Sequence, residues 1–558
     1  MQNKNNLINI KDLGINFGKA SAVKQADMII KQGQIMGLVG ESGSGKSTLA
    51  NAIIGLLPHA ANIIGGTMDF EGRDMLKFTK NQWQELRGRE ISYVSQDPMS
   101  ALNPTLRIGQ LMVDIQYGSD DTNEVKLKCA LDALEQVRMP NSKSRLDMYP
   151  HELSGGQKQR VCIAMAIMSR PKLLIADEIT TSLDATLEVQ IIKLLKELQS
   201  EIGCAMLFVT HHLTVVEALC DEVTVMYNGV IRETGSVQKV FSSPSDDYTK
   251  SLLLCDPARI QEKCRRLPVM SKLELKSISD PKMDKARIDL LAVPALSIDN
   301  LRVNFTKQRS LIDLLQRRPG MCIEAVKDAT LSVAIGETVA LVGESGSGKS
   351  TIARAVFRLV KAQGGRVLFD DADLLKATPH EMRAVRNRMS MMMQDPIGSL
   401  SPRTTIGAAV VEPYIISGQS SELNLGEEAN RLLELVGLPS DFSNRYPHEL
   451  SGGQARRVGV ARALALNPKL VIADEPTAGL DVSIQGEVFN LLASLREKMK
   501  LSILIITHNL HVVRHLADRI VIIYQGQIVE TGDTETIMSN PAHDYTKKLL
   551  AANLQAKY

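Results

Sequence analysis

Short motifs occur twice in this chain, in the same order and at nearly constant separation. The nonapeptide GESGSGKST stands at residues 40–48 and returns 303 residues later, at 343–351. Three further motifs return 297 residues later: HELSGGQ at 151–157 and 448–454, ADE at 176–178 and 473–475, and DYTK at 247–250 and 544–547. Solenoid repeats have periods of roughly 20–50 residues, so this much longer period predicts two copies of one domain.

The repeats also indicate domain boundaries. We predict a first domain over residues 1–255, a linker over 256–294 and a second domain over 295–558. The linker combines Pro residues with mixed charge and has no sustained apolar period, which is typical of a tether. The second copy carries 15 additional residues around 307–321. They form either a long hairpin or a second contact to a partner protein or to lipid, and both interpretations are open.

The composition excludes several classes of protein. With 44% hydrophobic and 23% charged residues, the chain is neither disordered nor fibrous. Its 65 basic and 63 acidic residues nearly balance, which argues against nucleic-acid binding. No apolar run approaches the ~20 residues of a membrane helix, and the N-terminus lacks a secretory-signal pattern. The seven Cys residues form no CxxC pair, as expected in a reducing compartment.

Apolar runs of β type alternate with helical stretches in each copy. One such run precedes the Gly-rich loop, at 34–39 and 338–342, and a second ends in the ADE motif, at 172–177 and 469–474. A third pair stands at 206–211 and 503–508. Fully apolar strands separated by helices predict an α/β domain with a mainly parallel sheet.

Both copies of GESGSGKST fit the phosphate-binding loop. Its glycines let backbone N–H groups surround phosphate oxygens, its Lys reaches the β- and γ-phosphates, and its Ser hydroxyl ligates Mg²⁺. The helix that follows directs its positive N-terminus at the anion. The predicted nucleotide-binding residues are Gly40, Ser42, Gly43, Gly45, Lys46, Ser47 and Thr48 in the first copy, and Gly343, Ser345, Gly346, Gly348, Lys349, Ser350 and Thr351 in the second.

An Asp-Glu pair ends one apolar strand in each copy. Asp177 and Asp474 can hold Mg²⁺ directly or through water. The adjacent Glu178 and Glu475 can act as the general base toward an attacking water. A solvated strand end is the alternative for such a pair, but its constant spacing from the other motifs in both copies favours the functional interpretation.

The LSGGQ pentapeptide opens a helical stretch in each copy. Its Ser and Gly residues can present N–H groups to a phosphate at the start of a helix. A simple helix cap is the alternative for the pentapeptide taken alone. The residues concerned are Ser154, Gly155, Gly156 and Gln157, and Ser451, Gly452, Gly453 and Gln454.

Together these motifs resemble the nucleotide-binding domain of ABC-type ATPases, over nearly all of the chain outside the linker. The resemblance implies two P-loop domains, each with a mainly parallel sheet core and a helical subdomain, that bind ATP and Mg²⁺. It implies catalytic roles for Gln96 and Gln394, which also ligate the metal, and for His211 and His508 at the γ-phosphate. His212 has no counterpart and is expected at the surface.

Two aromatic residues match the position that stacks on adenine in this family. Phe17 lies 29 residues before Lys46, and Phe305 aligns with Phe17 by local sequence across the insertion. An apolar core role is the alternative for both, and the two interpretations stand nearly even for Phe305.

The terminal segments SPSDDYTKSLL and NPAHDYTKKLL resemble the dipeptide, oligopeptide and nickel importer branch of the family. This resemblance implies an ATP-binding subunit that powers uptake of peptides or a related small solute. Its partners would be two transmembrane permeases, contacted by residues 99–105 and 397–404, and an external solute-binding protein. The chain would lie peripherally on the cytoplasmic side of the inner membrane. Ile179 departs from the pattern, because Pro usually follows the catalytic Glu.

The alternative function belongs to soluble tandem ABC proteins that act on ribosomes. Those proteins resemble this chain in length, but they usually carry a long, highly charged helical linker. The segment 256–294 is short and interrupted by Pro281 and Pro294, which favours the importer.

In the importer interpretation, the two halves form an internal pseudo-dimer around two ATP molecules. Lys46 would face Ser451 and Gly453, and Lys349 would face Ser154 and Gly156. Because both copies keep the Lys, Asp, Glu and His of the motif set, we expect two hydrolytically competent sites.

Overall fold

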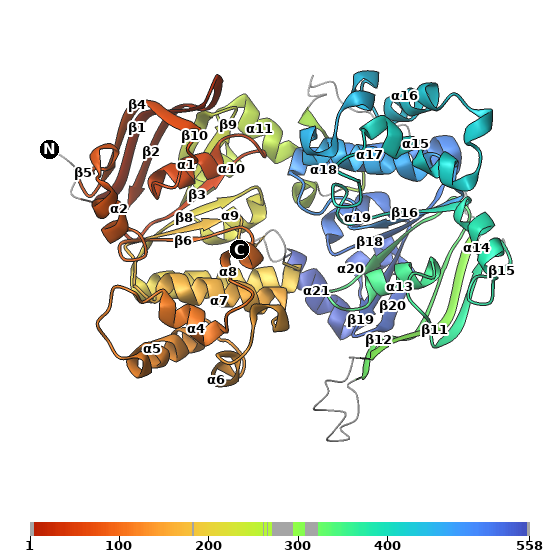
Figure 1. Ribbon diagram of the computed structural model, residues 1–558, viewed down its shortest axis with the longest axis horizontal. Helices are drawn as coiled ribbons and strands as arrows, with labels where there is room; N and C mark the ends of the chain where they lie inside the picture. Colours follow the sequence, from red (N-terminus) through yellow and green to blue (C-terminus); the bar gives the residue numbers. More distant parts are fainter. Residues whose placement is uncertain are drawn as a thin grey trace. The chain divides into compact units, whose positions relative to one another are not determined.

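The computed structural model describes residues 5–180, 183–260, 262–264, 266–270, 294–306 and 322–554. The chain divides into two compact units, the first ending at Arg259 and the second spanning Ile260–Leu554. Each unit is an α/β domain (Figure 1). Among the described residues, no helix combines the length and apolarity needed to cross a bilayer.

The first unit is built on one sheet with a parallel part and an antiparallel part. The strand order is β5 (Arg73–Asp74), β4 (Ala61–Phe70), β1 (Asn6–Phe17), β2 (Ala20–Lys31), β10 (Val230–Ser236), β9 (Glu222–Tyr227), β3 (Ile35–Val39), β8 (Ala205–Thr210), β7 (Leu173–Asp177) and β6 (Ile91–Val94). Neighbours from β9 to β6 pair in parallel, and β3, β7 and β8 are buried along their whole length. The parallel sheet predicted from these apolar runs is therefore confirmed.

The second unit repeats this strand order in two sheets. One is β12 (Cys322–Val333), β11 (Leu296–Thr306), β14 (Gly364–Phe369) and β15 (Ala372–Asp373); the other is β16 (Met389–Met392), β17 (Leu470–Asp474), β18 (Ser502–Thr507), β13 (Thr338–Val342), β19 (Arg519–Tyr524) and β20 (Gln527–Asp533). Val303 pairs with Val326 as Ile15 pairs with Val23, so the hairpin register is kept on both sides of the insertion. The insertion 307–321 itself lies outside the described residues.

Helices cover the sheets and form a separate helical part. The helices of the first unit are α1 (Lys46–Ile53), α2 (Lys80–Leu86), α3 (Pro98–Ala101), α4 (Ile108–Asp114), α5 (Asn123–Gln136), α6 (Ser142–Arg145), α7 (Gly155–Ile167), α8 (Ala185–Ile202), α9 (Leu213–Leu219), α10 (Val237–Ser242) and α11 (Asp247–Leu254). Those of the second are α13 (Lys349–Val356), α14 (Pro379–Arg386), α15 (Ile406–Ser417), α16 (Leu425–Leu435), α17 (Gly452–Leu464), α18 (Val482–Met499), α19 (Leu510–Leu516), α20 (Thr534–Ser539) and α21 (Asp544–Leu554).

The cores explain how the site is positioned. Helix α1 places Leu49 and Ile53 in one apolar cluster with Ile8 of β1 and Leu38 of β3. It is thus held between the antiparallel and the parallel strands. A second cluster joins α4, α5, α7 and α8, and Figure 1 shows α4 to α7 gathered at one end of the first unit, as α15 to α17 gather in the second.

Part of the segment predicted as linker packs against the second unit. Leu267 is only 3% exposed and belongs to the apolar cluster around α17 and α18. Its N–H donates to Asn490 Oδ1 at 2.8 Å, and Asn490 Nδ2 donates to its carbonyl at 2.8 Å. Arg266 donates to Glu497 Oε2 at 2.7 Å. The first copy has Lys193 where the second has Asn490, so α8 lacks this amide partner at the corresponding position.

This packing predicts that Leu267→Ala destabilises the second unit. Truncating a buried Leu removes apolar contacts and leaves a cavity, with a loss of about 2–4 kcal/mol in the free energy of unfolding. Urea titration of the full chain should detect this loss. Leu254→Ala is the matched control, because Leu254 is 50% exposed. Equal stability of the two variants would contradict the packing role.

Candidate functional site

The two phosphate-binding loops join a central strand to a helix. Residues 40–45 lead from β3 into α1, and residues 343–348 lead from β13 into α13. Lys46, Ser47 and Thr48, like Lys349, Ser350 and Thr351, are the first three residues of their helices. Gly45 and Gly348 adopt φ values of 102° and 106°, a conformation that side chains disfavour. The backbone thus requires glycine at the turn into each helix.

The loop lysines are buried at the start of these helices. Lys46 Nζ donates to the carbonyls of Gly40 and Glu41 at 2.7 and 2.9 Å. Lys349 Nζ makes the same contacts to Gly343 and Glu344, both at 2.7 Å. Each ammonium group is therefore held within the curve of its own loop, where a phosphate-binding cation is needed.

Each loop serine meets the strand-end aspartate. Ser47 Oγ donates to Asp177 Oδ1 at 3.2 Å, and Ser350 Oγ donates to Asp474 Oδ1 at 3.1 Å. A hydroxyl and a carboxylate are oxygen ligands of the kind that Mg²⁺ prefers, with phosphate oxygens and waters completing the shell. The donor set therefore fits this metal. Burial raises the pKa of both aspartates.

The two aspartates differ in their second partner. Tyr93 of β6 donates its hydroxyl to Asp177 Oδ2 at 2.8 Å, and burial raises the pKa of Tyr93. In the second unit, Met391 occupies the corresponding place in the register of β16 against β17. Asp474 therefore receives no phenol bond from this position of β16.

The glutamates that follow have a strained backbone that both copies share. Glu178 and Glu475 have φ values of 49° and 48°, which are uncommon for residues other than glycine. Their N–H groups donate to Val209 and Ile506 on the neighbouring strand, both at 2.8 Å. Backbone strain of this kind clusters at functional sites. The backbone of Glu178, which precedes Ile179, therefore has the same geometry as that of Glu475, which precedes Pro476.

Glu178 is surrounded by the other predicted catalytic side chains of its unit. Gln96 Nε2 donates to Glu178 Oε2 at 2.8 Å, and His211 Nδ1 lies 3.4 Å from Oε1. Burial acts to raise the pKa of Glu178, but the neighbouring His211 and the charge of Lys46 lower it overall. A lower pKa favours the ionised carboxylate, the form in which a general base acts.

Glu475 has a different set of contacts. His508 Nδ1 lies 2.8 Å from Glu475 Oε1, and Thr507 Oγ1 donates to Oε2 at 3.3 Å. Gln394 is exposed, and within the described part of the chain no hydrogen bond joins its side chain to Glu475. The structure thus brings Gln96 to its glutamate but does not bring Gln394 to its own.

His212, expected at the surface, is partly exposed, with 29% of its side chain accessible. Its Nδ1 lies 3.0 Å from Glu188 Oε1, and its ring stands edge-on to His211 at 4.5 Å. Burial opposes protonation, but Glu188 raises the pKa of His212 overall. This contact with a residue on α8 shields part of the side chain, and nothing in the local sequence signals such a pairing.

The LSGGQ motifs form the N-termini of α7 and α17. Ser154 Oγ accepts from the Gln157 N–H at 3.4 Å, while the Gln157 side chain accepts from the Ser154 N–H at 3.1 Å. Ser451 and Gln454 make the same reciprocal bonds. Gly155 and Gly452 begin the two helices. Such capping satisfies two donors and leaves the positive helix end available to an anion.

The two predicted adenine-stacking rings lie at corresponding places. Phe17 ends β1 opposite Ala20, and Phe305 lies on β11 opposite Ile323. Phe305 is 43% exposed, and Phe17 is partly exposed. The core alternative is therefore not supported for either ring, and adenine stacking stays a prediction.

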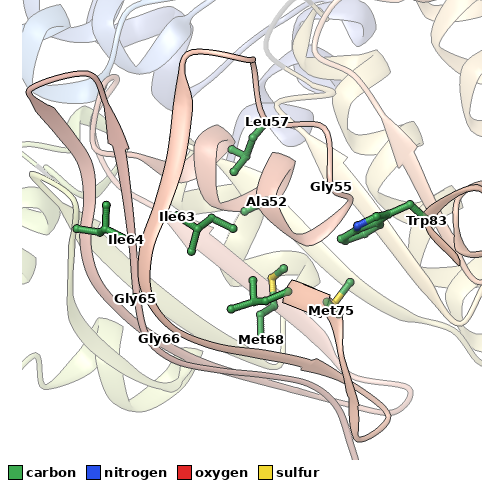
Figure 2. Close-up of a pocket in the computed structure, with 11 residues that line it drawn as sticks. Ala52, Gly55, Leu57, Ile63, Ile64, Gly65, Gly66, Met68, Met75 and Trp83 are labelled. Atoms are coloured by element: carbon green, nitrogen blue, oxygen red, sulfur yellow. The ribbon is translucent and has the colours of Figure 1, made fainter. Parts of the chain in front are cut away.

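A pocket of about 540 Å³ lies elsewhere in the first unit (Figure 2). It opens between the end of α1, strand β4 and Trp83 of α2. Ile63, Met68 and Met75 project into it in Figure 2. The lining contains no titratable side chain and none of the predicted site residues, so it does not contribute to the chemistry above.

Comparisons with known proteins show which families and proteins this chain is similar to. The family described as ABC transporter matches residues 23–181 and 326–478, and the family described as oligopeptide/dipeptide transporter, C-terminal region, matches 529–557. The glutathione import ATP-binding protein GsiA of Escherichia coli (strain K12) is 38% identical over 98% of this chain and 89% of the relative. That of Shigella dysenteriae serotype 1 is 39% identical over the same shares. A dimeric ATP-binding cassette bound to ADP and Pi is 28% identical, covering 43% of this chain and 98% of that chain, with a TM-score of 0.38.

Proposed function

This chain belongs to the ABC transporter family of ATPases, and we propose that it powers uptake of peptides or glutathione-like solutes through partner permeases. The family assignment covers both units, and the relatives are similar along nearly the whole chain. The importer branch is supported above all by one observation. The match at 529–557 is to the C-terminal region of oligopeptide and dipeptide transporters.

Hydrolysis follows from the groups gathered at each loop. Lys46 is placed to bind the β- and γ-phosphates, while Ser47 and Asp177 would hold Mg²⁺. Mg²⁺ held there would supply positive charge that offsets the charge developing on the phosphate oxygens. Glu178 accepts the proton of the attacking water, and Gln96 and His211 orient the glutamate and the γ-phosphate. The same roles in the second unit belong to Lys349, Ser350, Asp474, Glu475 and His508.

Both sites are proposed to turn over ATP. The glutamate backbone has the same φ in both units, so replacing the usual Pro by Ile179 leaves the base in place. The first site differs through Gln96 and Tyr93, which contact Glu178 and Asp177 directly. Because of this difference, we expect the two sites to hydrolyse ATP at unequal rates, with both sites active.

Permease contacts are proposed at the segments that follow Gln96 and Gln394. Met99 is 45% exposed and Ile397 is 41% exposed. Exposed apolar side chains at corresponding positions of two units fit a pair of similar partner helices. Through such partners the chain would lie on the cytoplasmic face of the inner membrane. The ribosomal alternative is disfavoured, because the relatives named above are import subunits.

The paired variant Met99→Asp, Ile397→Asp tests this proposal. A charge in an apolar contact should reduce co-purification with the permeases at least fivefold, since desolvating an unpaired carboxylate is unfavourable. Affinity purification from detergent-solubilised membranes measures this, with ATPase activity of the isolated chain expected to persist. Leu254→Asp, at an exposed leucine of α11 outside these two segments, is the control. Capture of ribosomal proteins instead of permeases would refute the importer function.

A further inference from the structure

The tyrosine of each DYTK motif contacts the start of the phosphate loop in its own unit. The Glu41 N–H donates to the hydroxyl of Tyr248 at 3.3 Å, and the Glu344 N–H donates to that of Tyr545 at 3.1 Å. These partners are 207 and 201 residues apart in the chain. The same long-range bond thus forms independently in both units.

Each tyrosine ring is held by a second tyrosine. Tyr248 stacks on Tyr227 with ring centroids 4.1 Å apart, and Tyr545 stacks on Tyr524 at 4.2 Å. Tyr227 and Tyr524 are the last residues of β9 and β19. Stacked rings restrict the rotation of the phenol, so its oxygen stays directed at the loop.

The β-hairpin that carries Tyr227 in the first unit, or Tyr524 in the second, also contacts the phosphate loop of its own unit. The Gly229 N–H donates to the Ser44 carbonyl at 3.0 Å, and the Gly526 N–H donates to the Ser347 carbonyl at 3.0 Å. A Cβ on Gly40 would lie 2.0 Å from the Met226 carbonyl. The loop is therefore in close contact with both the β9–β10 turn and the DYTK tyrosine.

The helices bearing these tyrosines are fixed at their N-termini. In the first unit, Glu233 of β10 accepts from the N–H groups of Ser245 and Asp246, and Asp246 caps the Tyr248 N–H at 2.9 Å. In the second, Glu530 of β20 accepts from Ala542 and His543. A glutamate on the strand after the hairpin thus sets the position of α11 and α21.

We propose that Tyr248 and Tyr545 are positioning residues for nucleotide binding, which hold each phosphate loop in its binding conformation. A loop whose Glu41 or Glu344 N–H is already bonded loses less conformational freedom when phosphates bind, and this pre-organisation increases affinity. The DYTK segments are then parts of the nucleotide sites. The inference rests on the phosphate-loop assignment proposed above.

The double variant Tyr248→Phe, Tyr545→Phe in the full chain tests this role. It removes both hydroxyls and keeps both ring stacks. We expect KM for ATP and the Kd for ADP to rise about fivefold, as loss of one hydrogen bond per site implies, with kcat and the melting temperature of the nucleotide-free chain unchanged. Tyr227→Phe with Tyr524→Phe is the matched control, because neither hydroxyl bonds to a phosphate loop in the described structure.

Two results would overturn the proposal. One is a Kd for ADP within twofold of the wild-type value. The other is a lower melting temperature with unchanged KM, which would indicate a purely structural tyrosine. Lys46→Met with Lys349→Met separates this failure from failure of the site assignment: if those substitutions also leave ADP affinity unchanged, the loops themselves are misassigned.

Discussion

Replacing Glu178 or Glu475 with glutamine should lower ATP turnover severely while nucleotide binding survives. The substitution keeps the size of the side chain and the strained backbone position, but an amide cannot accept the proton of the attacking water. General-base catalysis contributes about 10²- to 10⁴-fold to rate. ATP turnover by the double variant Glu178→Gln, Glu475→Gln should therefore fall by about this factor. Steady-state phosphate release measures the turnover, and equilibrium titration with labelled ATP measures the binding.

Each single variant reports on its own site. Because both glutamates have the same backbone geometry, Glu178→Gln should impair both ATPase and transport, despite Ile179. Glu434→Gln, on an exposed face of α16, controls for the change of charge. Near wild-type turnover in Glu178→Gln would mean that the first site is regulatory, and the proposal of two competent sites would be wrong.

The contacts that sequence motifs predicted well are those between residues near strand ends. The apolar runs before Gly40 and before Glu178 indicated two strands of one parallel sheet. The carboxyl ends of parallel strands lie at one edge. Ser47 and Asp177 were both predicted to hold Mg²⁺, and their side chains meet at 3.2 Å. Periodicity and chain direction are enough to place such residues.

The sequence did not predict contacts between side chains that are distant in the chain. His212 bonds Glu188 on another helix, and Leu267 packs on α18 across more than two hundred residues. The role of Tyr248 was missed in the same way, although its motif was noticed. Such contacts depend on which surfaces the fold brings together, and no local spacing or propensity carries that information. The difference between Tyr93 and Met391 can be interpreted only from the structure. It shows that Tyr93 bonds to Asp177 and that Met391 stands at the corresponding position in the second unit.

Replacing both loop lysines with methionine should abolish tight ATP binding. Lys46 and Lys349 are 4% and 7% exposed, so methionine fills similar volume without the ammonium charge. Hydrogen bonds to charged groups contribute about 1.5–3 kcal/mol each, which corresponds to roughly a 10- to 150-fold loss of affinity per site. Turnover should fall further, because the same charge stabilises the transferring phosphoryl group.

Calorimetric titration of the full chain with ATP in the absence of hydrolysis measures the lysine effect. Lys196→Met is the control, since its exposed side chain on α8 contributes charge without contact to a loop. Weakened binding with an unchanged melting temperature of the nucleotide-free chain would place the effect at the phosphates. Unchanged affinity would refute the assignment, because a buried ammonium group held against the Gly40 and Gly343 carbonyls would then have no anion to bind.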